Sequence, residues 1–260
     1  MTKPKVNYDA LAPQYNQRFN EEQPSDTERA LRALARRVGA RHVLEVACGT
    51  GHWLAALHEV CPAVYGLDLS AGMLSQARAR PQPLRLARGR AEQLPFATTI
   101  FDLVYCINAI HHFDEPERFI REAQRVLRAG QPLAVIGGVP HEQRESWYVY
   151  EFFEGCYETD VARFPTWEQV AGWMSAAGFE GIERREVERI VDHRQGRAVL
   201  EDPFLRKHSC SQLALLSDEA YAAGLARIEA ALVAAETQGE TLLFPVDLSV
   251  SMLLGYKRGH

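Results

Sequence analysis

Short apolar runs alternate with helix-like segments along the first half of this chain. Runs of strand length predict β-strands, and apolar periodicity with capping residues predicts the helices between them. The capping pattern Ser25-Asp-Thr-Glu28, for example, precedes a helix with Leu31, Leu34 and Val38 on one face. Strands that alternate with helices form a parallel sheet covered on both faces, so the pattern predicts an α/β fold. The predicted strands are His42–Ala47, Ala63–Asp68, Leu84–Ala87, Phe101–Ile107 and Pro132–Gly137.

Polar residues mark where further helices begin. Ser70 is the predicted N-cap of a helix that continues to about Ala79, and Asp114 is the predicted cap of a helix over Pro116–Arg128.

Strict alternation of strands and helices ends after the fifth strand, and a polar stretch follows the sixth. The later elements are a helix after the capping box Thr166-Trp-Glu-Gln169, a strand over Gly181–Val191, a helix from Ser217 to about Thr237, and a last strand over Phe244–Tyr256.

The first predicted strand runs into a turn of small residues, and the second ends in an acid. The turn is Ala47-Cys-Gly49-Thr-Gly51, and the acid is Asp68. Glycines let the backbone approach a ligand, and an acid at the end of the next strand can bind two ribose hydroxyls. This order predicts half of a nucleotide-binding crevice.

Two details disfavour a dinucleotide in this crevice. The third glycine of the G-x-G-x-x-G pattern permits close packing of helix on strand, but Leu54 occupies that place here. Glu45 precedes the turn, and its carboxylate would repel a pyrophosphate. The same carboxylate suits a ligand with a cationic amine. S-adenosylmethionine has such an amine, a sulfonium and a ribose, and it carries no phosphate.

These segments resemble the motifs of class I S-adenosylmethionine-dependent methyltransferases. Glu45–Gly51 resembles their first motif, with Ala47 where the commonest pattern has glycine, and Asp68 resembles the acid that ends their second strand. Gly89–Phe96 is similar to their adenine-contacting segment, and Phe101–Asn108 to their fourth strand. The resemblance spans about Tyr8 to Gly138. It implies a Rossmann-like, seven-stranded, mostly parallel sheet with helices on both faces, an antiparallel last strand beside the fifth, and a helical lid insertion.

The resemblance also implies a set of residues that bind the cofactor S-adenosyl-L-methionine. Asp68 would bind the ribose, unless it only caps the next helix. Glu45 would face the methionine amine through water, and Ala91 and Glu92 would meet the adenine. The full predicted set is Tyr15, Glu45, Ala47, Gly49, Gly51, Asp68, Leu69, Met73, Ala91, Glu92 and Asn108.

A general base is required only if the acceptor must lose a proton. His111, His112 and His141 are the candidates, and aromatic packing against the cofactor is the alternative role for the adjacent pair. Adjacent histidines rarely share one metal ion without further ligands, so no metal is expected.

Composition and charge limit the classes of partner and the compartment that we expect for this chain. The net charge of −5 and pI near 6.0 give no general electrostatic footprint for nucleic acid. No apolar run approaches the roughly 20 residues that span a bilayer, and the N-terminus lacks the apolar core of a signal peptide. Five scattered cysteines are typical of reduced thiols in a cytoplasmic protein.

The expected organisation is one methyltransferase domain over residues 1–260. It comprises an N-terminal helical segment (1–40), a cofactor-binding core (41–138) and an acceptor side (139–260) with a lid insertion at about 192–240. The expected function is methyl transfer to a small-molecule acceptor by in-line nucleophilic substitution. The alternatives are a non-catalytic S-adenosylmethionine-binding regulatory module and a nicotinamide-dependent oxidoreductase. The acceptor, the methylated atom and the oligomeric state stay open.

Overall fold

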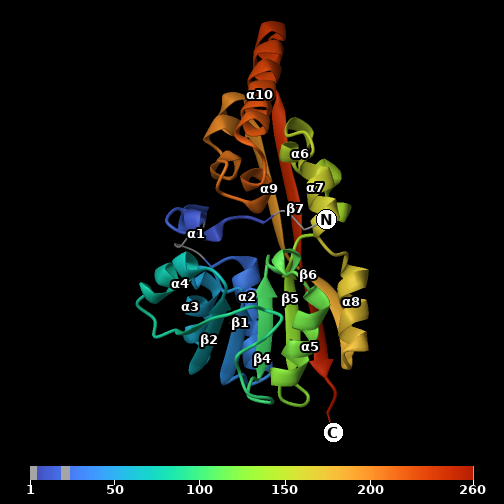
Figure 1. Ribbon diagram of the computed structural model, residues 1–260. Helices are drawn as coiled ribbons and strands as arrows, with labels where there is room; N and C mark the ends of the chain where they lie inside the picture. Colours follow the sequence, from blue (N-terminus) through green and yellow to red (C-terminus); the bar gives the residue numbers. More distant parts are fainter. Residues whose placement is uncertain (1–4, 19–23, 260) are drawn as a thin grey trace.

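The computed structural model describes residues 5–18 and 24–259 and contains a seven-stranded mixed sheet (Figure 1). The strand order is β3-β2-β1-β4-β5-β7-β6, with β1 to β5 in parallel and β7 antiparallel to both of its neighbours. The predicted fold class, including the antiparallel last strand beside the fifth, is confirmed. The strands are β1 His42–Val46, β2 Ala63–Asp68, β3 Arg85–Arg88, β4 Leu103–Ile107, β5 Pro132–Gly137, β6 Phe179–Gln195 and β7 Leu243–Lys257.

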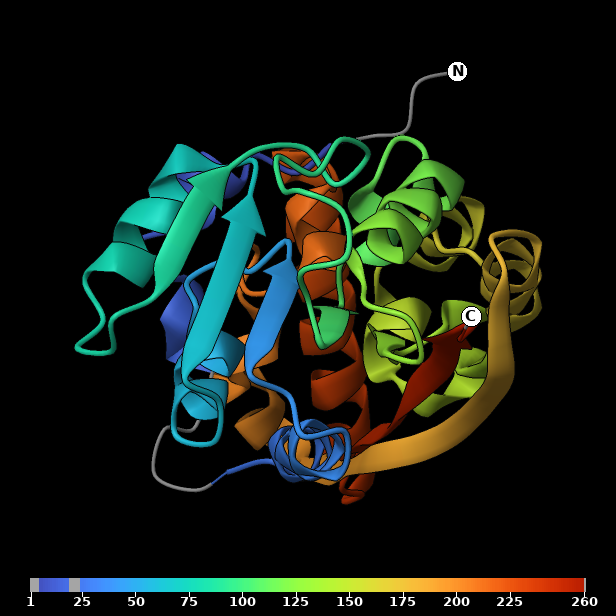
Figure 2. The same ribbon diagram turned by 90° about the horizontal axis from the view of Figure 1, so that it is seen from below.

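Helices cover both faces of the parallel part of the sheet (Figure 2). Alternate residues of β4 enter two separate cores: Val104 and Cys106 face one, and Leu103 and Tyr105 face the other. This alternation follows from the two-residue period of a strand. The helices α5 (Pro116–Val126) and α8 (Trp167–Ala176) contribute to the first core, and α2 (Asp26–Arg37), α3 (His52–His58) and α4 (Ala71–Arg78) to the second.

Three of the predicted helix caps have the expected geometry, and the first is Ser25, whose side chain accepts a hydrogen bond from the Glu28 N–H. The Ser70 side chain accepts a hydrogen bond from the Met73 N–H, and Thr166 and Gln169 form a complete capping box. The cap predicted at Asp114 is wrong. The N-cap of α5 is Glu115, with no side-chain cap, and the Asp114 carboxylate instead pairs with Lys5 and Arg90.

The last two strands extend well beyond the rest of the sheet (Figure 1). β5 pairs only with Ser251–Tyr256 of β7, whereas Leu243–Val250 pairs with the second half of β6 as a two-stranded ribbon. The predicted sixth strand ended at Val191, but pairing continues to Gln195. The ribbon therefore rises above the carboxyl ends of the parallel strands.

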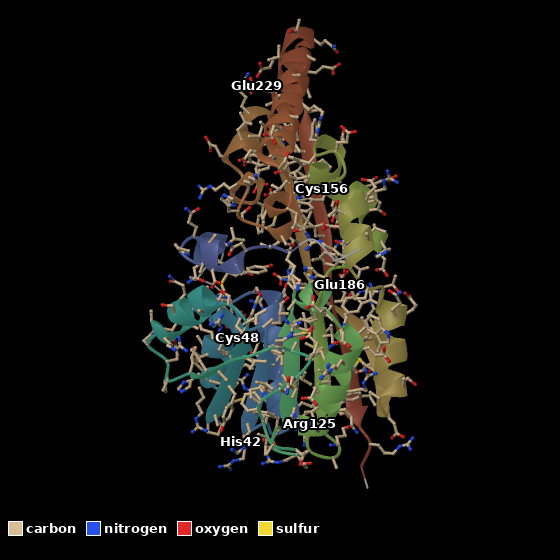
Figure 3. The ribbon with its side chains drawn as sticks, in the orientation of Figure 1. His42, Cys48, Arg125, Cys156, Glu186 and Glu229 are labelled. Atoms are coloured by element: carbon tan, nitrogen blue, oxygen red, sulfur yellow. The ribbon has the colours of Figure 1, made fainter. Side chains whose placement is uncertain are left out.

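A third core surrounds this ribbon and forms an upper part of the molecule, where Figure 3 labels Cys156 and Glu229. Phe153 and Cys156 pack there against Ile228 and Phe244, all of them buried. The helical elements of the upper part are α6 Tyr148–Phe152, α7 Cys156–Arg163, η5 Gly196–Glu201, η6 Pro203–Leu205, α9 Ser211–Ala214 and α10 Asp218–Gln238.

The N-terminal segment lies between the upper part and the sheet (Figure 1). It contains α1 (Tyr8–Leu11) and η1 (Tyr15–Arg18). Leu11 packs on Met73 of α4, and Ala214 of α9 packs against the same small cluster. The N-terminal segment and the insertion thus meet above the strand ends. Residues 1–4 and 19–23 of the predicted N-terminal helical segment lie outside the described residues.

Candidate functional site

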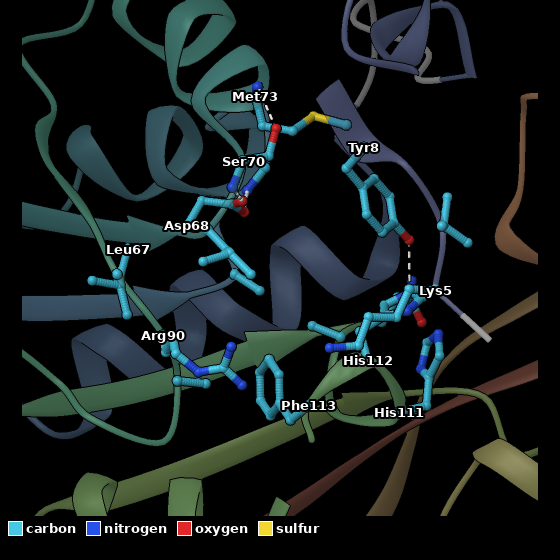
Figure 4. Close-up of a pocket in the computed structure, with 18 of the residues that line it drawn as sticks. Lys5, Tyr8, Leu67, Asp68, Ser70, Met73, Arg90, His111, His112 and Phe113 are labelled. Atoms are coloured by element: carbon cyan, nitrogen blue, oxygen red, sulfur yellow. Dashed lines mark hydrogen bonds between the residues drawn. The ribbon is translucent and has the colours of Figure 1, made fainter. Parts of the chain in front are cut away.

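A cavity of about 320 Å³ opens at the carboxyl ends of β1, β2 and β4, beneath the N-terminal segment (Figure 4). Ligands of open α/β sheets bind at this edge, where the strand order reverses. Most of the predicted cofactor-binding residues line this one cavity. These are Tyr15, Ala47, Gly49, Asp68, Leu69, Met73, Ala91, Glu92 and Asn108.

The glycine turn has an unusual backbone. Ala47, Gly49 and Gly51 have φ angles of 61°, 53° and 71°, so three residues of the turn are left-handed. Glycine adopts this region freely, whereas an alanine there is strained. Gly51 also begins α3 as a left-handed N-cap, whereas Ala47 and Gly49 line the cavity.

Asp68 is fixed at the end of β2 by two backbone donors. Its Oδ2 accepts a hydrogen bond from the Gly49 N–H at 2.8 Å, and its Oδ1 accepts one from the Ser70 N–H at 2.8 Å. Burial raises the pKa of Asp68, and these two donors oppose the increase because they favour the carboxylate. Each carboxylate oxygen retains a further lone pair for a ligand donor.

Glu45 lies beneath the turn and is 1% exposed. The Tyr105 hydroxyl donates a hydrogen bond to Glu45 Oε2 at 3.0 Å. Burial raises the pKa of Glu45 well above its ordinary value, and the nearby Asp68 carboxylate adds to this, while Tyr105 and the Arg80 guanidinium oppose it. Glu45 is not among the residues that line the cavity.

The loop after β3 is tied to the start of α5. Glu92 Oε1 accepts hydrogen bonds from the Asp114 N–H at 2.8 Å and the Glu115 N–H at 3.4 Å. Ala91 and Glu92 therefore form one wall of the cavity with Arg90, whose guanidinium pairs with Asp114.

Asn108 and two histidines form the wall after β4. Asn108 has a left-handed φ of 49°, and its N–H donates to the Ile136 carbonyl at 2.8 Å. A Cβ at Gly137 would lie 2.9 Å from Asn108 Oδ1, so this place favours glycine. His111 and His112 follow on a short 3₁₀ turn, Ile110–His112, and both line the cavity.

Comparison with known proteins agrees with this geometry. The model of a methyltransferase domain matches residues 44–135. A demethylmenaquinone methyltransferase of Lactiplantibacillus plantarum is 29% identical over 206 residues, which cover 67% of this chain and 86% of the relative. The chain belongs to the class I S-adenosylmethionine-dependent methyltransferases. S-adenosylmethionine is its cofactor.

Further relatives match about half of this methyltransferase. A phthiotriol/phenolphthiotriol dimycocerosates methyltransferase of Mycobacterium tuberculosis is 39% identical, over 56% of this chain and 52% of its own length. A chloroplastic 2-methyl-6-phytyl-1,4-hydroquinone methyltransferase of spinach, Spinacia oleracea, is 33% identical, over 56% of this chain and 41% of its own length. The matched region thus spans about half of these relatives.

Solved structures share the fold at low sequence identity. A methyltransferase from an antibiotic biosynthesis pathway of Anabaena variabilis aligns with a TM-score of 0.62 at 21% identity, covering 86% of this chain and 96% of that one. The phosphoethanolamine N-methyltransferase 2 of Haemonchus contortus, in complex with S-adenosyl-L-methionine, aligns at 0.59 and 18% identity, covering 96% of this chain and 57% of that one.

Three predicted site residues of this methyltransferase do not line the cavity. Gly51 packs against α4, where an added Cβ would lie 2.9 Å from Leu84 Cδ1 and 3.1 Å from Ala77 Cβ. Glu45 is beneath the turn, and His141 lies on another 3₁₀ turn, Pro140–Glu142, after β5. The structure therefore brings His111 and His112 together at the cavity without His141.

Lys5 and Asp9 also line the cavity, although no sequence motif indicated them. Asp9 Oδ1 accepts hydrogen bonds from Ser70 Oγ at 2.6 Å and the Gly72 N–H at 2.7 Å. Lys5 Nζ lies 2.9 Å from Asp114 Oδ1. These contacts join residues more than sixty positions apart. The only local signal is a helix start at Ser70, which favours a nearby acid.

Within the described ranges 5–18 and 24–259, no helix is long and apolar enough to cross a bilayer. Over the same ranges, no three His, Cys, Asp or Glu side chains cluster in a way that could bind a metal ion.

Proposed function

We propose that this enzyme transfers the methyl group of S-adenosylmethionine to a hydroxyl-bearing, mainly apolar small molecule. The observation that carries this proposal is the convergence of four strand ends on one cavity. Gly49 follows β1, Asp68 ends β2, Ala91 follows β3 and Asn108 follows β4. A ligand in this cavity would contact all four segments at once.

Each part of the cofactor has suitable partners in this arrangement. Asp68 would accept hydrogen bonds from both ribose hydroxyls, because its carboxylate faces the cavity in a fixed orientation. Ala91 and Glu92 would flank the adenine. Tyr15 and Asn108 would contact the methionine end, while Glu45 would act on the amine through water.

The reaction requires little covalent chemistry from the protein. An acceptor oxygen or ring carbon forms a bond to the methyl carbon as the carbon–sulfur bond breaks, and the electron pair of that bond stays on sulfur. The sulfonium is an activated leaving group, so the reaction requires no Lewis acid. Alignment of the two reactants and exclusion of water are the main contributions of the enzyme.

The proposed acceptor class rests on the cavity lining and on the relatives. Apolar side chains such as Val6, Leu69 and Phe113 line the cavity beside His111 and His112. The names of the relatives refer to a demethylmenaquinone, a phytyl hydroquinone and phthiotriol compounds. An acceptor with an apolar body and a hydroxyl group would fit that lining. It would also agree with the compounds in those names.

We also propose that residues 1–260 act as one methyltransferase unit, with the upper part on the acceptor side. The five cysteines are free thiols, which favours a reducing compartment such as the cytoplasm. A negative net charge favours a small acceptor over nucleic acid.

Two measurements test this function. Calorimetry should show binding of S-adenosylhomocysteine, the demethylated product, and no comparable binding of NAD. Transfer from methyl-labelled S-adenosylmethionine should then be measured with methylhydroquinone and reduced menadione, against an aliphatic amine and a carboxylic acid. Labelled product from the hydroquinones supports the proposal and excludes a binding-only module. Labelling of only the amine or the acid would contradict the proposed acceptor class.

A further inference from the structure

Tyr8 and His112 form a close polar pair across the cavity (Figure 4). The Tyr8 hydroxyl oxygen lies 2.6 Å from Nε2 of His112, and the two rings meet edge to face at 5.1 Å. We propose that Tyr8 and His112 act together as the general base that removes the acceptor proton. This inference rests on the proposed function, since the proton to be removed is that of a hydroxyl-bearing acceptor.

The pair lies at the reacting end of the cavity. Both side chains line it together with Asn108, the residue after β4 that would contact the methionine end of the cofactor. Asn108 lies just before the turn Ile110–His112, and the Tyr8 hydroxyl contacts His112, so we infer that this hydroxyl lies beside the place that the methyl group would occupy. An acceptor hydroxyl in that region is within reach of a short proton relay.

Contacts on both sides of Tyr8 fix its position. Lys5 forms an ion pair with Asp114 at the start of α5, and Asp9 accepts hydrogen bonds from Ser70 and Gly72 at the start of α4. The segment therefore spans the cavity between two anchors, with Tyr8 between them. A base must be positioned within hydrogen-bond reach of its proton, and this anchoring supplies the position.

The His112 ring is supported by a row of aromatic contacts. Its centroid lies 3.9 Å from that of His111, and His111 stacks on Phe164 at 3.7 Å with an interplanar angle of 13°. At the far end of this row the Arg163 guanidinium lies over the Phe164 ring, 5.0 Å from its centroid. Arg163 itself is buried with Asp160, so the row extends into the upper part of the molecule.

The nearby carboxylates are engaged with other donors. Asp9 binds Ser70 and Gly72, and Asp114 pairs with Lys5 and Arg90. Asp68 accepts from two backbone N–H groups on the far wall. Besides His112, the titratable rings next to Tyr8 are His111, through its contact with His112, and Tyr15, at 6.1 Å. Among these groups, Nε2 of His112 is therefore the basic atom closest to the Tyr8 hydroxyl.

The proton transfer balances with the methyl transfer. When Nδ1 of His112 carries the ring proton, the Tyr8 hydroxyl donates to Nε2. As the acceptor attacks the methyl carbon, its proton passes to the Tyr8 oxygen, and the Tyr8 proton passes to Nε2. The products are methylated acceptor, neutral S-adenosylhomocysteine and a His112 imidazolium, which loses its proton to water. Tyr8 returns to its starting state.

Rate and binding measurements on Tyr8→Phe, His112→Asn and the double variant test this pair. Each single variant should lower kcat for methylhydroquinone by about 10²-fold or more, because general bases contribute about 10²–10⁴-fold. The double variant should lose little beyond either single variant, since the two residues act as one unit. The affinity for S-adenosylhomocysteine should stay unchanged in all three. Tyr65→Phe removes a hydroxyl that contacts Arg85 away from the cavity, and it should keep wild-type kcat.

A second acceptor separates proton transfer from a structural role. Nitrohydroquinone has a more acidic hydroxyl, so its losses in the variants should be much smaller than those of methylhydroquinone. Equal losses for both acceptors, additive losses in the double variant, or a loss confined to cofactor affinity would overturn the inference. Wild-type inactivity toward every hydroquinone would instead contradict the proposed function.

Discussion

Gly49 donates its backbone N–H to Oδ2 of Asp68 across 2.8 Å, which joins the turn after β1 to the end of β2. The acid is thereby oriented by the same turn that approaches the ligand. Since Ser70 donates to the other oxygen, the carboxylate cannot rotate without losing both bonds. The carboxylate that we expect to bind the ribose is therefore already oriented before any cofactor binds.

Asp68→Ala should weaken binding of S-adenosylmethionine by about 1.5–3 kcal/mol, because it removes charge-assisted hydrogen bonds to the ribose. Titration calorimetry measures this loss directly. Asp68→Asn is the matched variant: it keeps the size of the side chain and one acceptor, so its loss should be smaller. Unchanged affinity in Asp68→Ala would mean that the ribose lies elsewhere.

Gly49→Val should abolish cofactor binding in a protein that still folds. Gly49 has a φ of 53°, where a β-branched side chain is strained, and its Cβ would face the cavity toward Tyr15. Gly39→Val is the control, since Gly39 has a φ of 60° and open space around its Cβ position. Both variants should lose similar stability by thermal unfolding. Only Gly49→Val should lose S-adenosylhomocysteine binding, and normal binding there would contradict the role of the turn.

Ala47→Gly should stabilise the protein slightly. The left-handed φ of 61° costs an alanine about 1–2 kcal/mol, whereas glycine costs about 0.5–1 kcal/mol through its entropy in the unfolded chain. Relief of strain therefore outweighs the entropic loss over most of this range, by up to about 1.5 kcal/mol. Urea unfolding of the two proteins measures the difference. A clear loss of stability would show that the Ala47 methyl group contributes packing that outweighs the strain.

These local features are the ones that sequence could predict. The turn, Asp68 and the Ser70 cap depend on residues close together in the chain, and their backbone requirements leave a clear signal. The Asp114 cap failed for a nonlocal reason: Lys5 and Arg90, both distant in sequence, engage the Asp114 carboxylate. Glu92, from the loop after β3, accepts from the N–H groups of Asp114 and Glu115 just before the helix.

The upper part could be predicted only in outline. β6 carries mostly exposed polar residues, so its apolar pattern did not reveal where it ends. Its second half pairs with β7 through cross-strand polar contacts, such as that of Arg189 with Asp247. The anchors of Lys5 and Asp9 likewise depend on tertiary contacts that no local pattern encodes.

Glu45→Gln should change how stability depends on pH. Burial raises the folded-state pKa of Glu45 above the unfolded value of about 4.3. The unfolded chain then releases this proton first, so the free energy of unfolding falls as pH rises from the unfolded pKa through the folded pKa. Glutamine has no proton to release, and the variant should lose this decline. Unfolding followed at several pH values above 4 checks it, with Glu142→Gln on the surface as control. Parallel profiles for Glu45→Gln and wild type would contradict the raised pKa.

The N-terminal segment and the insertion should close over the bound reactants as a lid. Tyr8 and Tyr15 line the cavity from above, and Ala214 of the insertion packs against the same cluster as Leu11 and Met73. An open cavity would leave the methyl group in water, whereas closure removes solvent and aligns the acceptor. Hydrogen exchange with S-adenosylhomocysteine should therefore show increased protection in residues 5–18 and within residues 192–237.

Protection within the insertion should be greatest over residues 203–214, because η6 and α9 lie nearest to the N-terminal segment. Strands β1 and β4 serve as the internal reference, since their hydrogen bonds belong to the central sheet and should change little. A gain confined to these strands would show that the ligand stiffens the sheet without closure. If neither segment gains protection, even with cofactor and a hydroquinone present, they do not form the lid. Selection of the acceptor would then lie in the fixed walls of the cavity around His111 and Phe113.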